Sequence, residues 1–400
     1  MLSETYLQKY ADVLVWGLVT ARANRFRKGD IISIHYESAA ISLAEVLYKN
    51  IVKMGLNAVL RYGMNINMEK TFYGESNLKQ LKFVSPGDPE FYKALNGGIH
   101  LRAPESLTHL KDIDPKRIGA VALSRKHLRD ILRDREEKGL YGWTLCMMAT
   151  EAMAYHAGIT FDQYESAIVK ACYLDKDDPV KEWKRILKDS SVIKKWLNKL
   201  PVKKFHIESA NCDLIIKRGE HRRWLGVSGH NIPSFELFMS PDWRETEGVY
   251  YADQPSYRSG NYVEGVKLYF RDGKVEKVDT KIGEDFVKAQ IAIDAGAKSI
   301  GEFSLTDKRF SRINQFMANT LFDENFGGNY GNCHIALGAS YTDTFDGDPS
   351  ALTKKNKMKL GFNDSALHWD LVNTEPKRVS AILKGGGKVI IYENGEFIMN

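Results

Sequence analysis

The chain of 400 residues is longer than a single hydrophobic core usually organises, so its length predicts two domains. Its 43% hydrophobic and 11% aromatic residues are typical of a globular protein and argue against intrinsic disorder. The net charge of +6, from 57 basic and 51 acidic residues, is too small an excess to indicate nucleic-acid binding.

The cysteines and the first residues of the chain bear on its compartment. Four cysteines lie far apart and form no C-x-x-C pair, which argues against a disulfide framework and against a thiolate zinc site. The N-terminal stretch has no basic leader or cleavage site, and its apolar run VLVWGLV is too short to cross a bilayer. These features predict a cytoplasmic protein that binds neither membranes nor nucleic acid.

The first half of the chain alternates β-like and helical segments. Strands are predicted over residues 30–36, 57–62 and 117–123, and helices over residues 38–55, 143–158, 161–175 and 177–200. This order predicts a largely parallel sheet that is covered by helices. No G-x-G-x-x-G or G-x-x-x-x-G-K-[ST] motif follows a predicted strand, so a nucleotide cofactor is not indicated.

The second half of the chain changes to many short strands. Residues 266–278 and 388–400 each have the pattern of a β-hairpin, with an Asp-Gly or an Asn-Gly pair at the turn. We therefore place a domain boundary near residue 202. The predicted fold combines α/β and α+β architecture: an N-terminal α/β domain with a mainly parallel sheet (residues 1–201) and a C-terminal, mixed, β-rich domain (residues 202–400).

Several polar residues of the second half lie in apolar surroundings. His368 and Asp370 are two residues apart in a strand-like run, so both side chains are expected on one face. Taken alone, each such residue has an ordinary explanation, for example a surface strand with a local hydrogen bond. The complete set is Glu236, Glu302, Asp323, Glu324, His334, Tyr341, His368 and Asp370.

Most of this set has the composition of a two-metal hydrolytic site. Three glutamates, one aspartate and two histidines supply oxygen and imidazole ligands without thiolates, which suits Zn²⁺, Co²⁺ or Mn²⁺. Two ions about 3.5–4 Å apart would lower the pKa of a bound water to about 7. Asp323 suits a helix end or a turn better, and Cys333 would face away from His334 in a strand.

Four ordered blocks resemble those of the M29 family of metallo-aminopeptidases: NIPSFELFMSP, IGEFSL, LFDENFGG…NCHIALGASY and NDSALHWDLV. Two upstream segments, KGDIISIHYESAAISLAEVLYKNIVKMG and ACYLDKDDPVKEW, resemble the family as well, so the resemblance covers almost the whole chain. It implies an exopeptidase that removes N-terminal amino acids from peptides with a free N-terminus. It also implies a catalytic C-terminal domain with two divalent ions (Zn, Co or Mn), and a homodimer.

The resemblance also implies roles for single residues. The metal ligands that it implies are Glu236, Glu302, Glu324, His334, His368 and Asp370. The catalytic residues are Tyr341 and Glu302; Glu302 would manage the proton of the attacking water and contact metal, whereas Glu236 is favoured as the bridging ligand. Nine residues separate Glu324 from His334, more than in other members, so Glu324 could bind metal directly or orient a ligand.

Two other function classes stay open at this point. A phosphoesterase could use the same metal site, and Arg309 and Arg312, which follow Glu302, are the kind of residue that phosphate chemistry recruits. A catalytically silent binding protein could have kept the fold, but the intact set of ligands argues against it.

Overall fold

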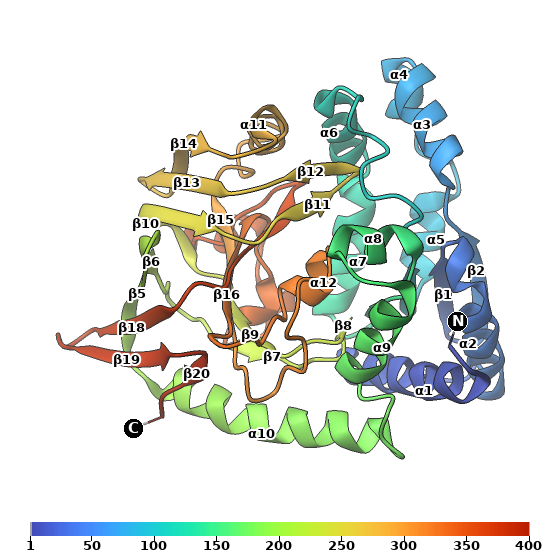
Figure 1. The fold of residues 1–400 in the computed structure, drawn as a ribbon, viewed down its shortest axis with the longest axis horizontal. Helices are drawn as coiled ribbons and strands as arrows, with labels where there is room; N and C mark the ends of the chain where they lie inside the picture. Colours follow the sequence, from blue (N-terminus) through green and yellow to red (C-terminus); the bar gives the residue numbers. More distant parts are fainter. Residues whose placement is uncertain (1, 400) are drawn as a thin grey trace.

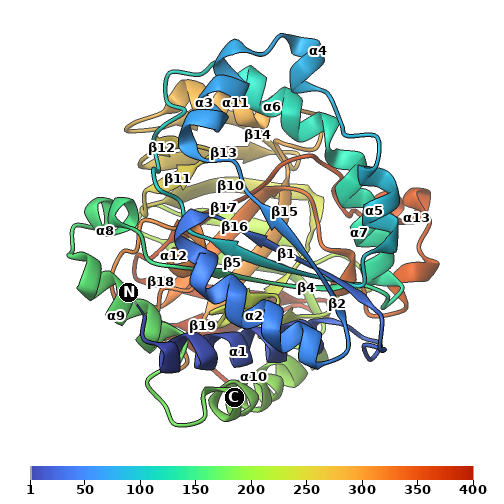
Figure 2. The same ribbon diagram turned by 90° about the vertical axis from the view of Figure 1, so that its right-hand side faces the viewer.

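The sheet of the first half is parallel throughout. The structure, a computed structural model, describes residues 2–399. The strand order is β2-β1-β3-β4-β8, and every neighbouring pair is parallel. These strands are β1 (Ile31–Tyr36), β2 (Asn57–Tyr62), β3 (Gly97–Arg102), β4 (Gly142–Met147) and β8 (Asn231–Ile232). Helices α1 (Glu4–Ala21) and α2 (Ile41–Lys53) pack on one face of this sheet (Figure 2).

Several helices of the first half begin at residues whose side chains cap them. Thr160 and Gln163 form a reciprocal capping box at the start of α9 (Phe161–Ala171). The side chain of Asp178 accepts a backbone hydrogen bond at the start of α10 (Pro179–Lys199), whose first residue is proline. The other helices are α3 (Ile66–Glu75), α4 (Leu78–Leu81), α5 (Asp88–Ala94), α6 (Pro115–Ser124), α7 (Lys126–Glu137) and α8 (Glu151–Ala157).

Two of the predicted elements in this half are wrong. Residues 117–123, expected as a strand, lie in α6, because the side chain of Asp114 caps the first turn and Pro115 occupies the first position. The helix predicted over residues 143–158 is strand β4 in its first part, and only α8 is helical. Because β4 is buried between two parallel neighbours, its apolar run carries no periodicity that distinguishes strand from helix.

Two antiparallel sheets dominate the second half (Figure 1). The larger has the order β14-β13-β10-β6-β5-β18-β19-β20, and the smaller has the order β17-β16-β15-β9-β7. Strands of the larger sheet are β5 (Val202–Ser209), β6 (Asp213–Lys217), β10 (Asp242–Ala252), β13 (Val266–Arg271), β14 (Lys274–Asp279), β18 (Lys377–Leu383), β19 (Lys388–Glu393) and β20 (Glu396–Phe397). Strands of the smaller sheet are β7 (Leu225–Gly226), β9 (Glu236–Met239), β15 (Ile300–Thr306), β16 (Asn332–Gly338) and β17 (His368–Asn373).

Smaller elements complete the second half: β11 (Ser256–Arg258), β12 (Asn261–Val263), α11 (Glu284–Ile291), α12 (Thr320–Asp323) and α13 (Lys354–Lys359). Both predicted hairpins are confirmed, as β13–β14 and β19–β20. Asp272 and Asn394 have positive φ at the turns, as do the glycines that follow them, which is the conformation that a two-residue hairpin turn requires.

Helix α10 connects two hydrophobic cores along its length (Figure 1). Trp183 and Ile186, near its start, belong to the core of the parallel sheet, whereas Ile193 and Leu197 belong to the core of the antiparallel sheets. Strand β8, from the second half, closes the parallel sheet beside β4. The division near residue 202 stays a prediction. Within residues 2–399, no helix has both the length and the apolar composition that crossing a membrane requires.

Candidate metal centre

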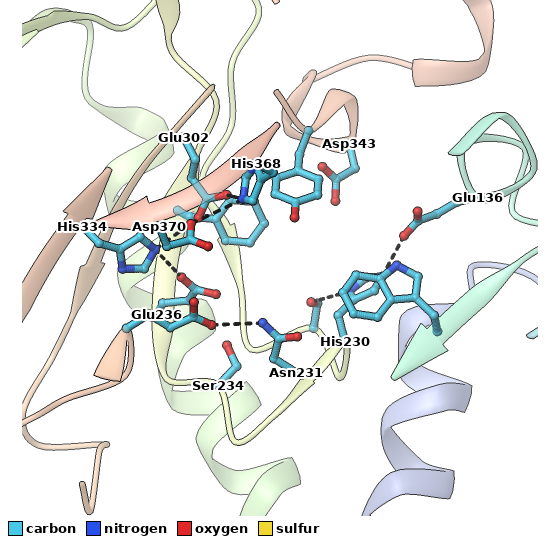
Figure 3. A pocket seen from close by; sticks show the side chains of 15 residues that line it. Glu136, His230, Asn231, Ser234, Glu236, Glu302, His334, Asp343, His368 and Asp370 are labelled. Carbon is cyan, nitrogen blue, oxygen red and sulfur yellow. Dashed lines mark hydrogen bonds and ion pairs between the residues drawn. The ribbon is translucent and has the colours of Figure 1, made fainter. Parts of the chain in front are cut away.

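The smaller antiparallel sheet brings together five of the residues predicted as metal ligands (Figure 3). They lie on four adjacent strands: Glu236 on β9, Glu302 on β15, His334 on β16, and His368 and Asp370 on β17. His368 Nε2 lies 3.4 Å from Asp370 Oδ1, so the expectation that these two side chains share a face is confirmed.

The five residues form two overlapping donor groups. Glu236, Glu302 and His334 make up the first donor group, and Glu302, His368 and Asp370 make up the second; the donor atoms within each group lie within 4.8 Å of one another. His334 Nε2 is 3.1 Å from Glu236 Oε2 and 3.4 Å from Glu302 Oε1. Glu302 Oε2 faces His368 Nε2 at 3.7 Å. Glu302 is therefore the carboxylate that both groups share, although the sequence analysis favoured Glu236 for a bridging role.

Two contacts hold these side chains in orientation. Ser304, also on β15, donates its hydroxyl hydrogen to Glu236 Oε2 at 2.9 Å. His368 Nδ1 lies 2.9 Å from the carbonyl oxygen of Ala339, and because a carbonyl can only accept, Nδ1 is the donor. Nε2 of His368 is then the nitrogen that faces the carboxylates and that a metal ion could use.

The electrostatics of the donor groups favour a cation. Burial and the charge of Glu236 raise the pKa of Glu302 to about 7, although a hydrogen bond from His334 opposes this. Burial alone would lower the pKa of His368, but Asp370 and Glu302 raise it to about 9. Both shifts mean that an added positive charge is favourable at this position.

The donor set fits a divalent metal ion. No lysine or arginine is present among the described residues that line the pocket, so only histidines offset the charge of its buried carboxylates there. Carboxylate oxygens and imidazole nitrogens are the ligands that Zn²⁺, Co²⁺ and Mn²⁺ take in hydrolytic sites.

Glu324 and Tyr341 line the same pocket but belong to neither donor group. Glu324 follows α12, and its Oε1 accepts a hydrogen bond of 3.2 Å from Asn231 Nδ2. Burial and the charges of other carboxylates raise the pKa of Glu324 well above its usual range. The ring of Tyr341 lies 4.8 Å from that of His368, centroid to centroid, and its backbone N–H donates to Ser240 Oγ.

The remaining residues that the sequence analysis considered lie elsewhere. Asp323 accepts hydrogen bonds from two backbone N–H groups, at Met317 and Asn319, as a turn residue does. Arg309 pairs with Asp307, and Arg312 pairs with Asp175. Neither arginine is among the described residues that line the pocket.

Eight other residues that line the pocket were not singled out from the sequence. They are Glu136, Trp143, Ser228, His230, Asn231, Ser234, Phe238 and Asp343. Glu136 comes from α7 and Trp143 from β4, so they are far from the recognised blocks in sequence. The segment SGHN, whose last residue begins the first block, is the one signal that could have drawn attention, because it gathers polar side chains ahead of Glu236.

Comparison with known proteins agrees with this geometry. The family model described as thermophilic metalloprotease (M29) matches residues 3–397. Aminopeptidase PepS of Streptococcus thermophilus is 24% identical, with 98% of each chain covered. Aminopeptidase AmpS of Bacillus subtilis (strain 168) is 28% identical, with 72% of this chain and 73% of the relative covered.

A solved structure shares the fold. The wild-type AmpT of Thermus thermophilus superposes with a TM-score of 0.78 over 98% of this chain and 99% of its own, at 18% identity. The predicted fold class, α/β with a parallel sheet followed by a β-rich part, is confirmed by this match and by the sheet topology. The family implies an enzyme that depends on a divalent metal. The chain belongs to the M29 family of metallopeptidases, as its sequence blocks predicted.

Proposed function

We propose that this protein is an aminopeptidase that removes N-terminal residues from peptides by means of two divalent ions. The observation that carries the proposal is the pair of donor groups that share Glu302, because a shared carboxylate is how two ions are held close together. A relative named an aminopeptidase, PepS, aligns with 98% of this chain, which supports the substrate class. Zn²⁺, Co²⁺ and Mn²⁺ all suit these ligands.

Six residues would hold the ions in this proposal: Glu236, Glu302, His334, His368 and Asp370 directly, and Glu324 either directly or through its contact with another ligand. When bound, the ions would supply Lewis acidity and a water of lowered pKa. The carboxylate of Glu302 would accept the proton of the attacking water.

Tyr341 would stabilise the tetrahedral intermediate by donating a hydrogen bond to its oxyanion. Burial and the charge of Glu302 raise the pKa of the Tyr341 phenol well above its usual value, so the hydroxyl keeps its proton and stays a donor. Two residues hold the loop that carries Tyr341. Ser240 accepts a hydrogen bond from the backbone N–H of Tyr341, and Glu137 accepts one from Thr342 and forms an ion pair with Lys357.

The arrangement favours a peptidase over the phosphoesterase alternative. Phosphoryl transfer relies on arginine or lysine near the transferred group. Arg309 and Arg312 are engaged with Asp307 and Asp175, outside the described lining of the pocket.

The proposal includes a cytoplasmic homodimer with a catalytic C-terminal domain from residue 202. Cys146, Cys172, Cys212 and Cys333 are free and buried, which is compatible with a reducing compartment. Sedimentation velocity of the purified chain tests the dimer.

A substrate panel with elemental analysis tests the activity. The purified enzyme should contain about two divalent ions per chain and cleave leucine p-nitroanilide, whereas N-acetyl-leucine p-nitroanilide should be a very poor substrate. The free amine is the anchor, and acetylation removes its charge and its lone pair. Equal cleavage of both compounds, or hydrolysis of p-nitrophenyl phosphate instead, would contradict the proposal.

A further inference from the structure

Two carboxylates on the pocket wall opposite the donor groups have no part in the proposed chemistry. Glu136 lies at the end of α7, and Asp343 lies in a short helical turn at residues 342–344. Both line the pocket that contains the donor groups, and Figure 3 shows them on the side away from His334 and Glu236. We call Glu136, Trp143, His230 and Asp343 the acidic wall.

Glu136 has a partner within the acidic wall, whereas Asp343 does not. Glu136 Oε1 lies 2.8 Å from His230 Nε2, and Ser228 Oγ lies 2.7 Å from Nδ1 of the same ring. Asp343 Oδ1 is buried and has no hydrogen-bond partner among the described residues. The one arginine that reaches this turn, Arg223, donates its Nε–H to the backbone oxygen of Asp343.

A buried carboxylate oxygen without a hydrogen-bond partner is costly unless a ligand supplies one. Burial, with the charge of Glu136, raises the pKa of Asp343 to about 6, so the group is still mostly ionised at neutral pH. No lysine or arginine is among the described residues that line the pocket, and the charges of His230 and Arg223 offset the raised pKa of Asp343 only in part. A cationic group on the substrate would supply the hydrogen-bond partner that Asp343 Oδ1 lacks.

Two aromatic residues of the pocket suit a long cationic side chain. Trp143 lines the pocket with its ring against His230, 4.7 Å between centroids, and Phe238 lines it from the smaller sheet. Aromatic rings pack against the methylene stems of lysine and arginine, and their faces attract the charged head.

The charges on the two sides of the pocket differ once metal is bound. Two divalent ions would balance the carboxylates of the donor groups, but at the acidic wall only His230 and, beside Asp343, Arg223 offset the negative charge. Burial lowers the pKa of His230, but the contact with Glu136 outweighs it and the net shift is upward. One positive charge on a substrate would complete the balance at Asp343.

We propose that the acidic wall, with Asp343 as its central residue, selects peptides whose N-terminal residue is lysine or arginine. The inference rests on the proposed aminopeptidase function, because that function places the reacting amine and carbonyl at the donor groups. The side chain of the same residue then extends across the pocket toward Asp343, with Glu136 as a second carboxylate.

A pair of substrates that differ in charge tests the selection. Lysine and norleucine p-nitroanilides have side chains of nearly equal length, and only lysine is cationic. We expect kcat/KM of the metal-loaded enzyme to be at least about 10-fold higher for lysine, and Asp343→Asn to lower that ratio by about 10-fold or more at equal metal content. Asp346→Asn is the matched control: Asp346 pairs with the exposed His221, lies outside the described lining, and should leave the ratio unchanged.

A binding measurement keeps the test independent of the variant's folding. Calorimetry on the wild-type holoenzyme should show lysinamide binding at least about 10-fold more tightly than norleucinamide. A lysine-to-norleucine ratio near one in both assays overturns the acidic-wall proposal while leaving the aminopeptidase intact. An Asp343→Asn variant with an unchanged ratio overturns the role of Asp343. If neither anilide is cleaved although metal is bound, the proposed function itself fails, and the selection fails with it.

Discussion

The two sides of the pocket are built in different ways. The donor groups come from four adjacent strands of one sheet, and every residue of β15 and β16 is buried. The acidic wall is assembled from a helix end, the start of strand β4, a loop and a short turn. The groups proposed to hold ions lie on rigid, paired strands, whereas the groups proposed to select a side chain lie mostly on connecting segments, which can vary without disturbing the chemistry.

Removing the shared carboxylate should have the largest effect. Glu302→Gln takes an ionised ligand from both donor groups, so we expect metal content to fall and kcat to drop by more than the 10²–10³ that one lost stabilising contact costs. Elemental analysis and initial rates measure the two effects. Glu136→Gln is the control from the acidic wall, and it should keep its metal. Full metal content in Glu302→Gln would show that the two groups do not depend on this residue.

Tyr341→Phe should separate catalysis from metal binding. The ring remains beside His368, but the proposed oxyanion donor is lost, so kcat should fall by about 10²–10³ at unchanged metal content. Measuring kcat at saturating metal concentration distinguishes a lost catalytic contact from a loss of bound metal. An unchanged kcat under those conditions would remove Tyr341 from the mechanism.

Ser304→Ala should weaken metal binding with a smaller effect on the rate. Losing the hydrogen bond to Glu236 frees that carboxylate to rotate, and contacts of this kind contribute about 10- to 100-fold to metal affinity. Titration against a competing chelator measures the affinity. Ser380→Ala is a matched control, because Ser380 is buried on a strand of the larger sheet and its hydroxyl has no hydrogen-bond partner within residues 2–399. Equal affinities in the two variants would argue against an orienting role for Ser304.

Ser228→Ala should give the smallest effect, and only in selectivity. It removes one neutral hydrogen bond from His230, which contributes about 0.5–1 kcal/mol. We expect the lysine-to-norleucine ratio to change by about two- to five-fold, with metal content unaltered. A large loss of metal in this variant would show that the two sides of the pocket are coupled more closely than their separate construction suggests.

Much of the donor side was predictable because its residues lie in short ordered blocks. An alternating strand places His368 and Asp370 on one face, and the order of the blocks identified the family. The identity of the shared carboxylate was not predictable, since it depends on the register of β15 between β9 and β16. The acidic wall was missed because Glu136 lies in a strongly charged helix, where the sequence pattern indicates an ordinary surface residue. Only the fold brings it next to His230.

The sequence by itself determined the features that neighbouring residues control. Asp272-Gly273 and Asn394-Gly395 specify hairpin turns, and Asp178 before Pro179 specifies a helix start, because each preference acts within a few bonds. Only the tertiary structure decided that residues 142–147 form a strand, that β8 closes the parallel sheet, and that Asp343 faces the donor groups across one pocket. These outcomes depend on which segments bury one another across long separations in the chain, and burial is a property of the whole fold.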